Sequence, residues 1–437
     1  MQLRPPIDPA RARRVLVLHP HGPGQFAALA ARLAARPDCQ VVLLTRSMPA
    51  VVPGVRSVRY RIARNPTRGV HAYARWSESA VLAGQAALRA VLALRRNGFV
   101  PDIVIAHPGW GDALFLRDAL PDARIVLYCE YFWRGSGADV GFADDAATTL
   151  DAQCALRMRN APLLAALEAA DTLYAPTAWQ RDLHPAWLRD RIAVIHDGID
   201  TDRVRPDPGA RFRLPDGIVL GAACEVVTYV ARGLEPQRGF PQLMRALPGL
   251  LARRPAAQVV ICGSDQVCYS YPPPGHATWR EALLAELGGL PARVHFVGAL
   301  AYADYLSLLQ VSALHLYPSV PFVLSWSMTE AMAAGCVVLG SDTPPVCEFI
   351  TDGANGFLVE MRSPEAIAGR AAALLDRRDT LGPLRRQARA TIVARCALAE
   401  CLAAQESLIA GAWAARSKGN SESTVPTAAR QSGCAMP

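Results

Sequence analysis

Lysine is almost absent from this chain. Lys418 is its single lysine, and arginine supplies the rest of the 46 basic residues, which give a formal net charge of +8. Long apolar runs are absent too, because no segment reaches the roughly 18 uninterrupted apolar residues that a membrane-spanning helix needs. The first residues, Met1 to Pro6, have no hydrophobic stretch of the kind found in signal peptides. These absences predict a cytoplasmic protein without a transmembrane helix.

Paired cysteines are also missing. None of the eleven cysteines forms a CxxC pair, and the nearest neighbours, Cys262/Cys268 and Cys396/Cys401, have no histidines at the spacing of a zinc site. Asp342 and Glu348 form no DxD pair with a neighbour, and no Asp/His/Cys cluster has metal-ligand spacing. Scattered cysteines among apolar residues are typical of core positions in a reducing compartment. We therefore expect no metal site and no cofactor.

The length and the hydrophobic pattern predict two domains. A chain of 437 residues is too long for one core, and short apolar strands alternate with helices in both halves. The pattern predicts parallel, doubly wound sheets, with the boundary near residue 205, where Pro206-Asp207-Pro208-Gly209 interrupts it. The predicted strands are 15–19, 41–45, 103–106 and 125–128 in the first half, and 226–230, 258–262, 294–297, 313–317 and 336–340 in the second.

Helices and loops fill the remaining segments. The pattern predicts helices over 26–35, 74–96, 151–170, 364–377 and 380–414. Residues 135–149 are rich in Gly, Ala and Asp and predict a loop over a cleft. The tail from 417 to 437 has almost no large apolar side chain, which is typical of disorder.

One strand-loop-helix unit in the second half points to a phosphate-containing ligand. A buried strand ending at Tyr317 is followed by a loop and a helix that contains Glu330, and a second buried strand follows from Val337. This order puts a helix N-terminus at the carboxyl edge of a parallel sheet, where backbone N–H groups favour a phosphate. A carboxylate one turn into that helix can accept hydrogen bonds from both hydroxyls of a ribose.

Several residue strings together resemble one enzyme family. They are His107-Pro108-Gly109-Trp110-Gly111, Glu130-Tyr131-Phe132-Trp133-Arg134, Pro321-Phe322-Val323-Leu324-Ser325-Trp326-Ser327 and Glu330-Ala331-Met332-Ala333-Ala334-Gly335. The chain resembles the retaining, nucleotide-sugar-dependent glycosyltransferases of family four, in particular a bacterial subgroup, over roughly residues 14 to 410. The resemblance implies the α/β GT-B fold, in which two Rossmann-like domains face each other across a cleft. It also implies an acceptor domain (1–205), a donor domain (206–395) and a helix (396–416) that crosses back to the first domain.

The resemblance implies a set of catalytic and donor-binding residues. Arg232 and Arg238 follow the strand at 226–230, and two guanidinium groups near glycines suit a leaving diphosphate. The family has Arg then Lys here, whereas this chain has two arginines and one extra residue between them. His107 is implied beside the transferred sugar. Further donor contacts are implied for Glu330, Ser325, Ser327, Gly22, Gly24 and Glu348, and acceptor contacts for Trp110, Glu130 and Tyr131.

One position departs from the family pattern. In the family, a second glutamate lies eight residues before the one that corresponds to Glu330, and it contacts hydroxyls of the transferred sugar. This chain has Phe322 at that position. The departure leaves the sugar undefined and argues against a double displacement through that residue.

Arginine is concentrated in one stretch of the first half. Residues 41–101 contain ten arginines and one acid, Glu78. This bias is expected either from a GC-rich genome or from a basic surface for an anionic membrane or a lipid-diphosphate acceptor. No nucleic-acid-binding module is visible, so we expect no nucleic acid partner.

These patterns predict a metal-independent, retaining hexosyltransferase. It would move a hexose-type sugar from a nucleotide-diphosphate sugar to a glycan or lipid-linked acceptor in bacterial polysaccharide or glycoconjugate synthesis, as a cytoplasmic enzyme that can associate peripherally with the inner face of the membrane. Two alternatives stay open: a nucleotide-sugar 2-epimerase with this fold, and a non-catalytic sugar-nucleotide-binding protein.

Overall fold

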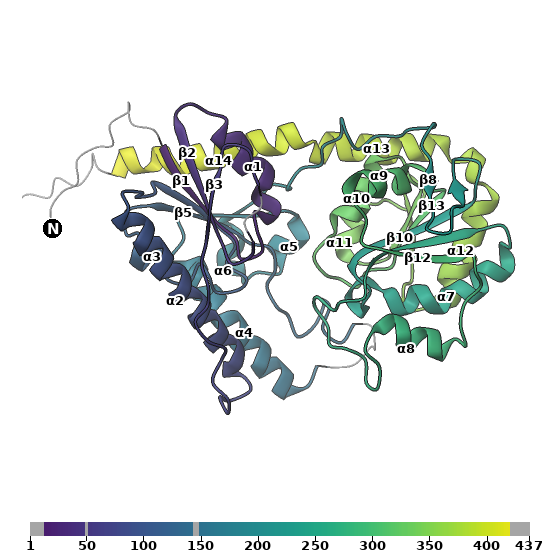
Figure 1. Ribbon diagram of the computed structural model, residues 1–437, viewed down its shortest axis with the longest axis horizontal. Coiled ribbons are helices and arrows are strands. Elements are labelled where there is room, and N and C mark those ends of the chain that lie inside the picture. Colours follow the sequence, from purple (N-terminus) through teal and green to yellow (C-terminus); the bar gives the residue numbers. More distant parts are fainter. Residues whose placement is uncertain (1–12, 49–50, 143–147, 420–437) are drawn as a thin grey trace, which may run out of the picture.

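The protein has two α/β domains placed side by side (Figure 1). The structure is a computed structural model and describes residues 13–48, 51–142 and 148–419. The first domain holds a seven-stranded sheet in the order β3-β2-β1-β4-β5-β6-β7, with all neighbouring strands parallel. Its strands are β1 (Arg13–Leu18), β2 (Cys39–Thr45), β3 (Arg56–Arg59), β4 (Ile103–Ala106), β5 (Arg124–Tyr128), β6 (Thr172–Ala175) and β7 (Ile192–Val194).

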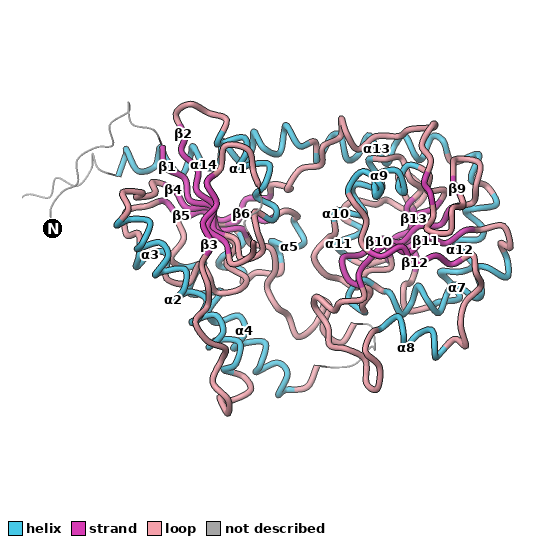
Figure 2. Tube along the Cα trace, in the orientation of Figure 1, coloured by secondary structure: helices cyan, strands magenta, loops and turns pink. Residues whose placement is uncertain are grey.

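Helices cover both faces of this first sheet, which explains why its central strands are continuously apolar. All four residues of β4 are buried, as are the last four of β1. The long helices α2 and α4 lie side by side and extend beyond the sheet (Figures 1 and 2). The helices of this domain are α1 (Ala27–Ala34), α2 (Ala74–Arg96), α3 (Leu116–Ala119), α4 (Leu150–Glu168), α5 (Ala178–Asp182) and α6 (Ala186–Arg189).

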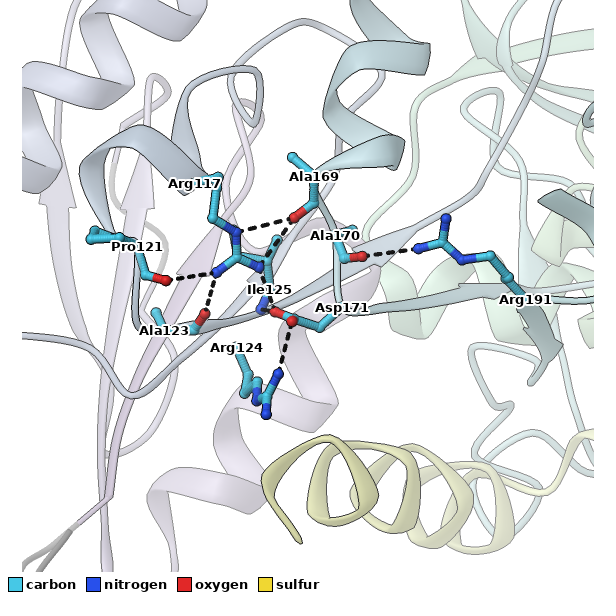
Figure 3. A network of polar contacts seen from close by, with 9 residues as sticks. All are labelled: Arg117, Pro121, Ala123, Arg124, Ile125, Ala169, Ala170, Asp171 and Arg191. Atoms are coloured by element: carbon cyan, nitrogen blue, oxygen red, sulfur yellow. Dashed lines mark hydrogen bonds and ion pairs between the residues drawn. The ribbon is translucent and has the colours of Figure 1, made fainter. Parts of the chain in front are cut away.

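Asp171 fixes the segment that leads from α4 into β6. Its carboxylate accepts a hydrogen bond from the backbone N–H of Ile125 (2.8 Å) and pairs with Arg117 (2.7 Å) and Arg124 (2.9 Å). Figure 3 shows how Arg117 also donates to the carbonyl oxygens of Pro121, Ala123 and Ala169. The network ties the start of β5 to the start of β6 at the amino edge of the sheet. The carboxyl ends of the strands lie at the opposite edge.

The second domain repeats the architecture. Its six-stranded parallel sheet has the order β12-β11-β10-β13-β14-β15, and a two-stranded sheet of β8 and β9 lies beside it. The strands are β8 (Phe212–Arg213), β9 (Val219–Leu220), β10 (Val226–Gly233), β11 (Gln258–Ser264), β12 (Val294–Gly298), β13 (Leu314–Tyr317), β14 (Val338–Ser341) and β15 (Phe357–Val359). The helices are α7 (Phe240–Arg253), α8 (Trp279–Glu286), α9 (Tyr302–Gln310), α10 (Trp326–Ala333), α11 (Pro344–Cys347) and α12 (Pro364–Asp376).

Two C-terminal helices connect the domains. The helix α13 (Gly382–Cys396) is interrupted at Ala397, and the chain continues as α14 (Leu398–Gly419), which runs back along the first domain (Figure 1). The break has a local cause, because Ile199 of the interdomain segment donates to the carbonyl of Cys396 (2.7 Å) and accepts from Leu398 (2.9 Å). Arg32 of α1 pairs with Glu406 of α14 at 2.7 Å.

The structure confirms the predicted α/β class with two doubly wound sheets. Six strands were not predicted, because each has at most four residues and at least one of them is not buried; they are β3, β6, β7, β8, β9 and β15. Of the predicted disordered tail, residues 417–419 continue α14 and residues 420–437 lie outside the described part of the chain. Residues 143–147 of the predicted loop 135–149 also lie outside it. Among the described residues, no helix is both long and apolar enough to cross a membrane.

Candidate active site

Both sheets have a topological switch point at their centre. In the first domain it lies between β1 and β4, and in the second between β10 and β13. Ligands of open parallel sheets bind in the crevice at such points, outside the carboxyl ends of the strands. Predicted site residues lie at the carboxyl ends of all four strands. Gly22 and Gly24 follow β1, His107 follows β4, Arg232 is the last residue but one of β10, and Ser325 follows β13.

The two carboxyl edges face each other. The indole N–H of Trp326, at the start of α10, donates to Asp197 of the first domain at 2.8 Å. The ring of Phe322, which follows β13, packs on the ring of Tyr131, which follows β5, with centroids 4.8 Å apart. The carboxyl edges of both sheets therefore border one interdomain cleft.

His107 holds a carboxylate at the edge of this cleft. The buried ring accepts a hydrogen bond at Nδ1 from the backbone N–H of Gly109 (3.0 Å), so the proton of a neutral ring lies on Nε2. Nε2 is 3.2 Å from Oε2 of Glu130. Because both ring nitrogens are engaged, His107 in this arrangement positions Glu130 rather than offering a free nitrogen to a substrate.

Two further histidines, which sequence reasoning missed, follow β1. Burial lowers the pKa of His19 to about 2, so this ring is neutral. Burial also lowers the pKa of His21, and the next contributions come from the guanidinium groups of Arg46 and Arg232. Arg46 belongs to the first domain and Arg232 to the second, so His21 lies where positive charge from both domains converges.

The glycine-rich loop is shaped by these histidines. A Cβ atom at Gly24 would lie 2.7 Å from the ring of His19, and its φ of +51° is a conformation that other residues rarely adopt. Gly22 has a φ of +82°, and its backbone N–H donates to the hydroxyl of Thr45 at 2.9 Å. The loop therefore turns tightly over β1 and brings His21 to the cleft.

A small pocket of about 70 Å³ between the domains contains two carboxylates. Glu130 and Asp197 line it from the first domain, and Val323, Leu324 and Trp326 line it from the second. Both hydrogen bonds of Asp197 use one carboxylate oxygen, which accepts from Trp326 and from the hydroxyl of Tyr128 (3.1 Å). The side chain of Glu130 is 28% exposed. Glu130 is therefore the carboxylate that a substrate in the cleft can reach.

The stability of the protein is expected to depend on pH through Asp197. Burial raises the pKa of Asp197 from 3.8 to about 6, against the opposing effect of its hydrogen bonds. Because its pKa is raised on folding, the folded state binds the Asp197 proton more tightly than the unfolded state does. The stability that this proton contributes is fully present below pH 4 and is lost as the pH rises through about 6. Urea unfolding of the wild type and Asp197→Asn between pH 4 and 7 measures it. The free energy of unfolding of the wild type should fall relative to the variant across this window, whereas parallel curves would show that burial does not perturb Asp197.

Glu330 lies one turn into α10 as predicted from the sequence, but it has partners that the sequence did not indicate. Its carboxylate accepts hydrogen bonds from the hydroxyls of Tyr302 (2.7 Å) and Tyr305 (2.6 Å), both on α9. Burial raises the pKa of Glu330. Tyr305 is buried, whereas Tyr302 is 40% exposed. An incoming hydroxyl can therefore replace the Tyr302 hydroxyl without opening the core.

Ser325 and Ser327 shape the start of α10. The hydroxyl of Ser325 accepts a hydrogen bond from the backbone N–H of Ser327 (3.3 Å) and so caps the helix. The two hydroxyls are 3.0 Å apart, and Ser327 also donates to the carbonyl of Val230. The structure thus gives both serines a structural task at the helix N-terminus, where the sequence predicted donor contacts.

The two predicted diphosphate arginines differ in their surroundings. Arg232 is exposed at the cleft end of β10. Arg238 is buried; its guanidinium lies 5.3 Å from the ring centroid of Phe322 and donates to the carbonyl of Val323 at 2.6 Å. The following residue must be glycine, because a Cβ at Gly239 would lie 1.6 Å from the carbonyl oxygen of Pro318.

Aromatic side chains surround Phe322, the residue at the departing position. Its ring is 3% exposed and lies 4.9 Å from that of Tyr269, in addition to its contact with Tyr131. The hydroxyl of Tyr131 donates to Asp139 at 2.6 Å, and its ring is buried. Tyr131 therefore packs between the domains, where the sequence predicted an acceptor contact.

Glu235 is a residue of the Arg232–Gly239 run to which the sequence assigned no role. Its fully buried carboxylate accepts hydrogen bonds from the backbone N–H groups of Cys268, Tyr269 and Ser270 and from the hydroxyl of Ser270. These bonds fix the loop after β11 and hold Tyr269 against Arg238. Its place between the two predicted site arginines is the sequence signal that could have indicated a role.

Glu348 connects the domains in the structure. Its carboxylate accepts hydrogen bonds from the backbone N–H groups of Ala178 (2.9 Å) and Trp179 (2.8 Å) at the start of α5. Arg395 lies 3.7 Å from the same carboxylate. Glu348 thus holds α5 of the first domain, and the donor contact predicted from the sequence stays a prediction. Trp110, in contrast, lines a separate pocket of about 470 Å³ in the first domain.

Among the residues that the structure describes, no three His, Cys, Asp or Glu side chains are grouped so as to hold a metal ion. The arrangement instead offers two arginines and a helix N-terminus for an anion, a carboxylate for a diol and a reachable carboxylate across the cleft.

Comparison with known proteins gives a separate family match for each domain. Residues 37–204 match the family described as "Glycosyl transferase family 4 group", and residues 223–391 match "Glycosyl transferases group 1". Each domain is thus similar to a glycosyltransferase family. The fold resembles that of sucrose-phosphate synthase from Thermosynechococcus elongatus (TM-score 0.68, 18% identity, 92% of this chain and 100% of that chain). It also resembles HepE from Anabaena in complex with UDP and glucose (TM-score 0.64, 15% identity, 91% and 100%). These likenesses establish the GT-B fold of the chain.

Curated relatives match over part of their length. A D-inositol 3-phosphate glycosyltransferase from Nocardia farcinica is 31% identical over 198 residues, which are 44% of this chain and 42% of the relative. A GDP-mannose-dependent phosphatidylinositol monomannoside mannosyltransferase from Mycobacterium tuberculosis is 30% identical over 195 residues, 43% of this chain and 48% of the relative. The chain thus spans less than half the length of these relatives.

Proposed function

We propose that the protein is a retaining glycosyltransferase that moves a hexose-type sugar from a nucleotide-diphosphate sugar to a glycan or lipid-linked acceptor in bacterial glycoconjugate synthesis. The observation that supports this proposal most is that the switch points of the two sheets lie on the two sides of one cleft. Arg232, Arg238 and Glu330 lie on the side of the second domain, and the His107–Glu130 pair lies on the side of the first domain. The two glycosyltransferase family matches support the reaction class.

In this proposal the charge on the leaving diphosphate is stabilised by the protein itself. Arg232 reaches the diphosphate from the exposed end of β10, Arg238 holds the loop before α10, and the N-terminus of α10 adds its dipole. The bond between the anomeric carbon and the phosphate oxygen breaks while the acceptor oxygen bonds to the same face of that carbon. The acceptor proton passes to the leaving phosphate oxygen, which gives retention without a protein nucleophile or a metal ion.

Glu130 is assigned an electrostatic role in this reaction. As the phosphate leaves, positive charge develops on the sugar ring, and a reachable carboxylate beside residues 323–324 stabilises it. Position 322 provides no carboxylate, so Glu130 supplies one from the opposite domain. His107 keeps the Glu130 side chain in this orientation.

Glu330→Gln is expected to weaken nucleotide binding about tenfold, or ~1.4 kcal/mol. The carboxylate accepts two hydroxyl donors in the structure and can exchange the exposed one, Tyr302, for a ribose hydroxyl, whereas an amide is a weaker acceptor. Calorimetry with UDP, GDP, ADP and dTDP measures the affinity and identifies the base. Glu365→Gln, at the first turn of α12, is the matched control and should bind like the wild type. Equal affinities in both variants would leave Glu330 as a structural partner of the tyrosines.

The arginine-rich stretch 41–101 is expected to attract the protein to anionic membranes. Each basic residue held near an anionic surface contributes about 1 kcal/mol, and salt screens the attraction over about 8 Å. Co-sedimentation with vesicles containing phosphatidylserine should exceed that with phosphatidylcholine alone at low salt and should decline as salt is added. Equal binding to the two vesicle types would contradict the membrane proposal and favour a soluble acceptor.

A further inference from the structure

The first domain contains a pocket of about 470 Å³ that none of the donor-binding residues lines. Its walls come from Arg46, the segment after β3, the first turns of α2 and the loop after β4. Pockets for small ligands typically measure about 300–1,000 Å³, so this one is large enough for a ring with substituents. The lining residues are Arg46, Ile62, Ala63, Arg64, Asn65, Pro66, Trp76, Ser79, Ala80, Leu82 and Trp110.

The pocket presents two guanidinium groups and, among the residues that the structure describes, no acidic side chain. Arg46 is fixed by Asp112, a fully buried carboxylate that also accepts a hydrogen bond from the hydroxyl of Tyr60. Arg64 pairs with Glu78 at 2.9 Å, and the Arg64 side chain is 55% exposed. Neither acid lies among the lining residues, so a ligand meets the guanidinium groups rather than the carboxylates that pair with them. A fork of N–H donors held in place suits a phosphate.

Two indole rings complete the walls of the pocket. The ring faces of tryptophan are suited to the C–H faces of a sugar or cyclitol. Behind Trp76 lies Arg159, whose guanidinium is sandwiched between Trp76 (4.3 Å) and Trp133 (3.3 Å). Its Nε has no hydrogen-bond partner within the described part of the chain, and burial lowers its pKa to about 10. The charge of Arg159 increases the positive potential beside the pocket. A bound anion would offset the free-energy cost of burying this charge.

The pocket adjoins the place of the proposed reaction. Trp110 lines it and lies 4.9 Å from the ring of His21 and 4.4 Å from that of His107. His21 in turn is close enough to Arg46 in the pocket and to Arg232 in the donor domain for both to lower its pKa. A ligand in the pocket therefore has a short path to the proposed diphosphate site.

We propose that this pocket binds the acceptor, and that the acceptor is a polyol ring bearing a phosphate group. The phosphate meets Arg64 and Arg46, and the ring stacks on Trp76 and Trp110 with one hydroxyl directed toward the cleft. The assignment rests on the proposed glycosyltransferase function and adds the acceptor class to it. The phosphate belongs either to a soluble phosphate ester or to a phospholipid headgroup.

Binding without a donor tests this assignment. Calorimetry of the full chain with D-inositol 3-phosphate, glucose 6-phosphate and glucose 1-phosphate is compared with myo-inositol, glucose and inorganic phosphate. At least one phosphorylated ring should bind tenfold or more tightly than both its neutral ring and inorganic phosphate. Vesicles of phosphatidylinositol in phosphatidylcholine, added as competitors, distinguish the two sources of the phosphate. If no phosphorylated ring binds better than its neutral counterpart, in solution or on vesicles, the assignment is wrong.

Variants locate the binding. Arg64→Gln and Trp76→Leu should each weaken binding of the phosphorylated ring about tenfold or more. Arg89→Gln and Arg96→Gln, which remove the same charge from the other end of α2, should leave it unchanged. Equal losses in all four variants would show only a diffuse effect of charge. Release of nucleoside diphosphate by the wild type, measured separately, shows whether a failure concerns this pocket or the glycosyltransferase proposal itself.

Discussion

Arg238→Ala is expected to lower the turnover of sugar transfer by about 10²-fold or more. In the proposed reaction the guanidinium carries positive charge toward the leaving diphosphate. In the structure it donates to the carbonyl of Val323, which holds the loop before α10. Alanine removes the charge and leaves a gap beside Phe322 and Tyr269. Initial rates of nucleoside diphosphate release with a saturating donor measure the effect.

Three further variants separate charge from packing. Arg238→Lys keeps the charge and should be milder than alanine, because the resembling family has lysine at this place. Arg232→Ala removes an exposed side chain, so it should lower turnover by a similar 10²-fold without changing the melting temperature. Arg253→Ala, on the exposed side of α7, is the control and should match the wild type. Wild-type rates in both Arg232→Ala and Arg238→Ala would remove the diphosphate assignment.

Glu130→Gln is expected to lower turnover by about 10²-fold or more while leaving donor affinity nearly unchanged. The carboxylate lines the interdomain pocket opposite Val323 and Leu324, and it is held there by His107. An amide has the same shape and no negative charge, so it cannot stabilise positive charge that develops on the sugar ring. Steady-state kinetics with separately varied donor and acceptor measures both quantities.

The split between the kinetic constants decides what Glu130 does. A fall in turnover at unchanged donor affinity supports the electrostatic role. A rise in the acceptor KM at unchanged turnover would instead make Glu130 an acceptor contact, which is the role predicted from the sequence. Glu168→Gln, at the exposed end of α4, is the matched control and should change neither constant.

The sequence predicted the sheets well because their central strands are buried on both faces. All four residues of β4 are buried, so the sequence of this strand is continuously apolar. Several such strands separated by helices indicate a parallel sheet with helices on both faces. The short edge strand β3 has only exposed or half-buried residues and gave no such signal. The order of elements also placed Arg232 and His107 at carboxyl ends of strands and Glu330 in the first turns of the helix after β13.

The partners of these site residues could not be predicted, because they come from elements far apart in the sequence. Glu330 is held by tyrosines of α9, Glu235 by a loop after β11, and Glu348 by the first turn of α5 in the other domain. A local sequence pattern predicts that an acid lies near the start of a helix, but it does not predict which hydrogen-bond donors contact that acid. Likewise, Phe322 was recognisable as a missing carboxylate, whereas the Tyr131 and Tyr269 rings that surround it appear only in the folded chain.

The most direct test of the proposed function is the fate of the donor. The protein is incubated with a panel of UDP-, GDP-, ADP- and dTDP-linked hexoses, with and without the phosphorylated rings named above, and free nucleoside diphosphate and the sugar are followed together. The proposed function predicts that diphosphate release is increased by an acceptor and that the sugar appears on the acceptor with the anomeric configuration of the donor. Arg238→Ala should slow both by about 10²-fold or more. Binding of a nucleotide sugar without any release would identify a non-catalytic binding protein, and conversion of the sugar to its C2 epimer without an acceptor would identify an epimerase. Either result would contradict the glycosyltransferase proposal.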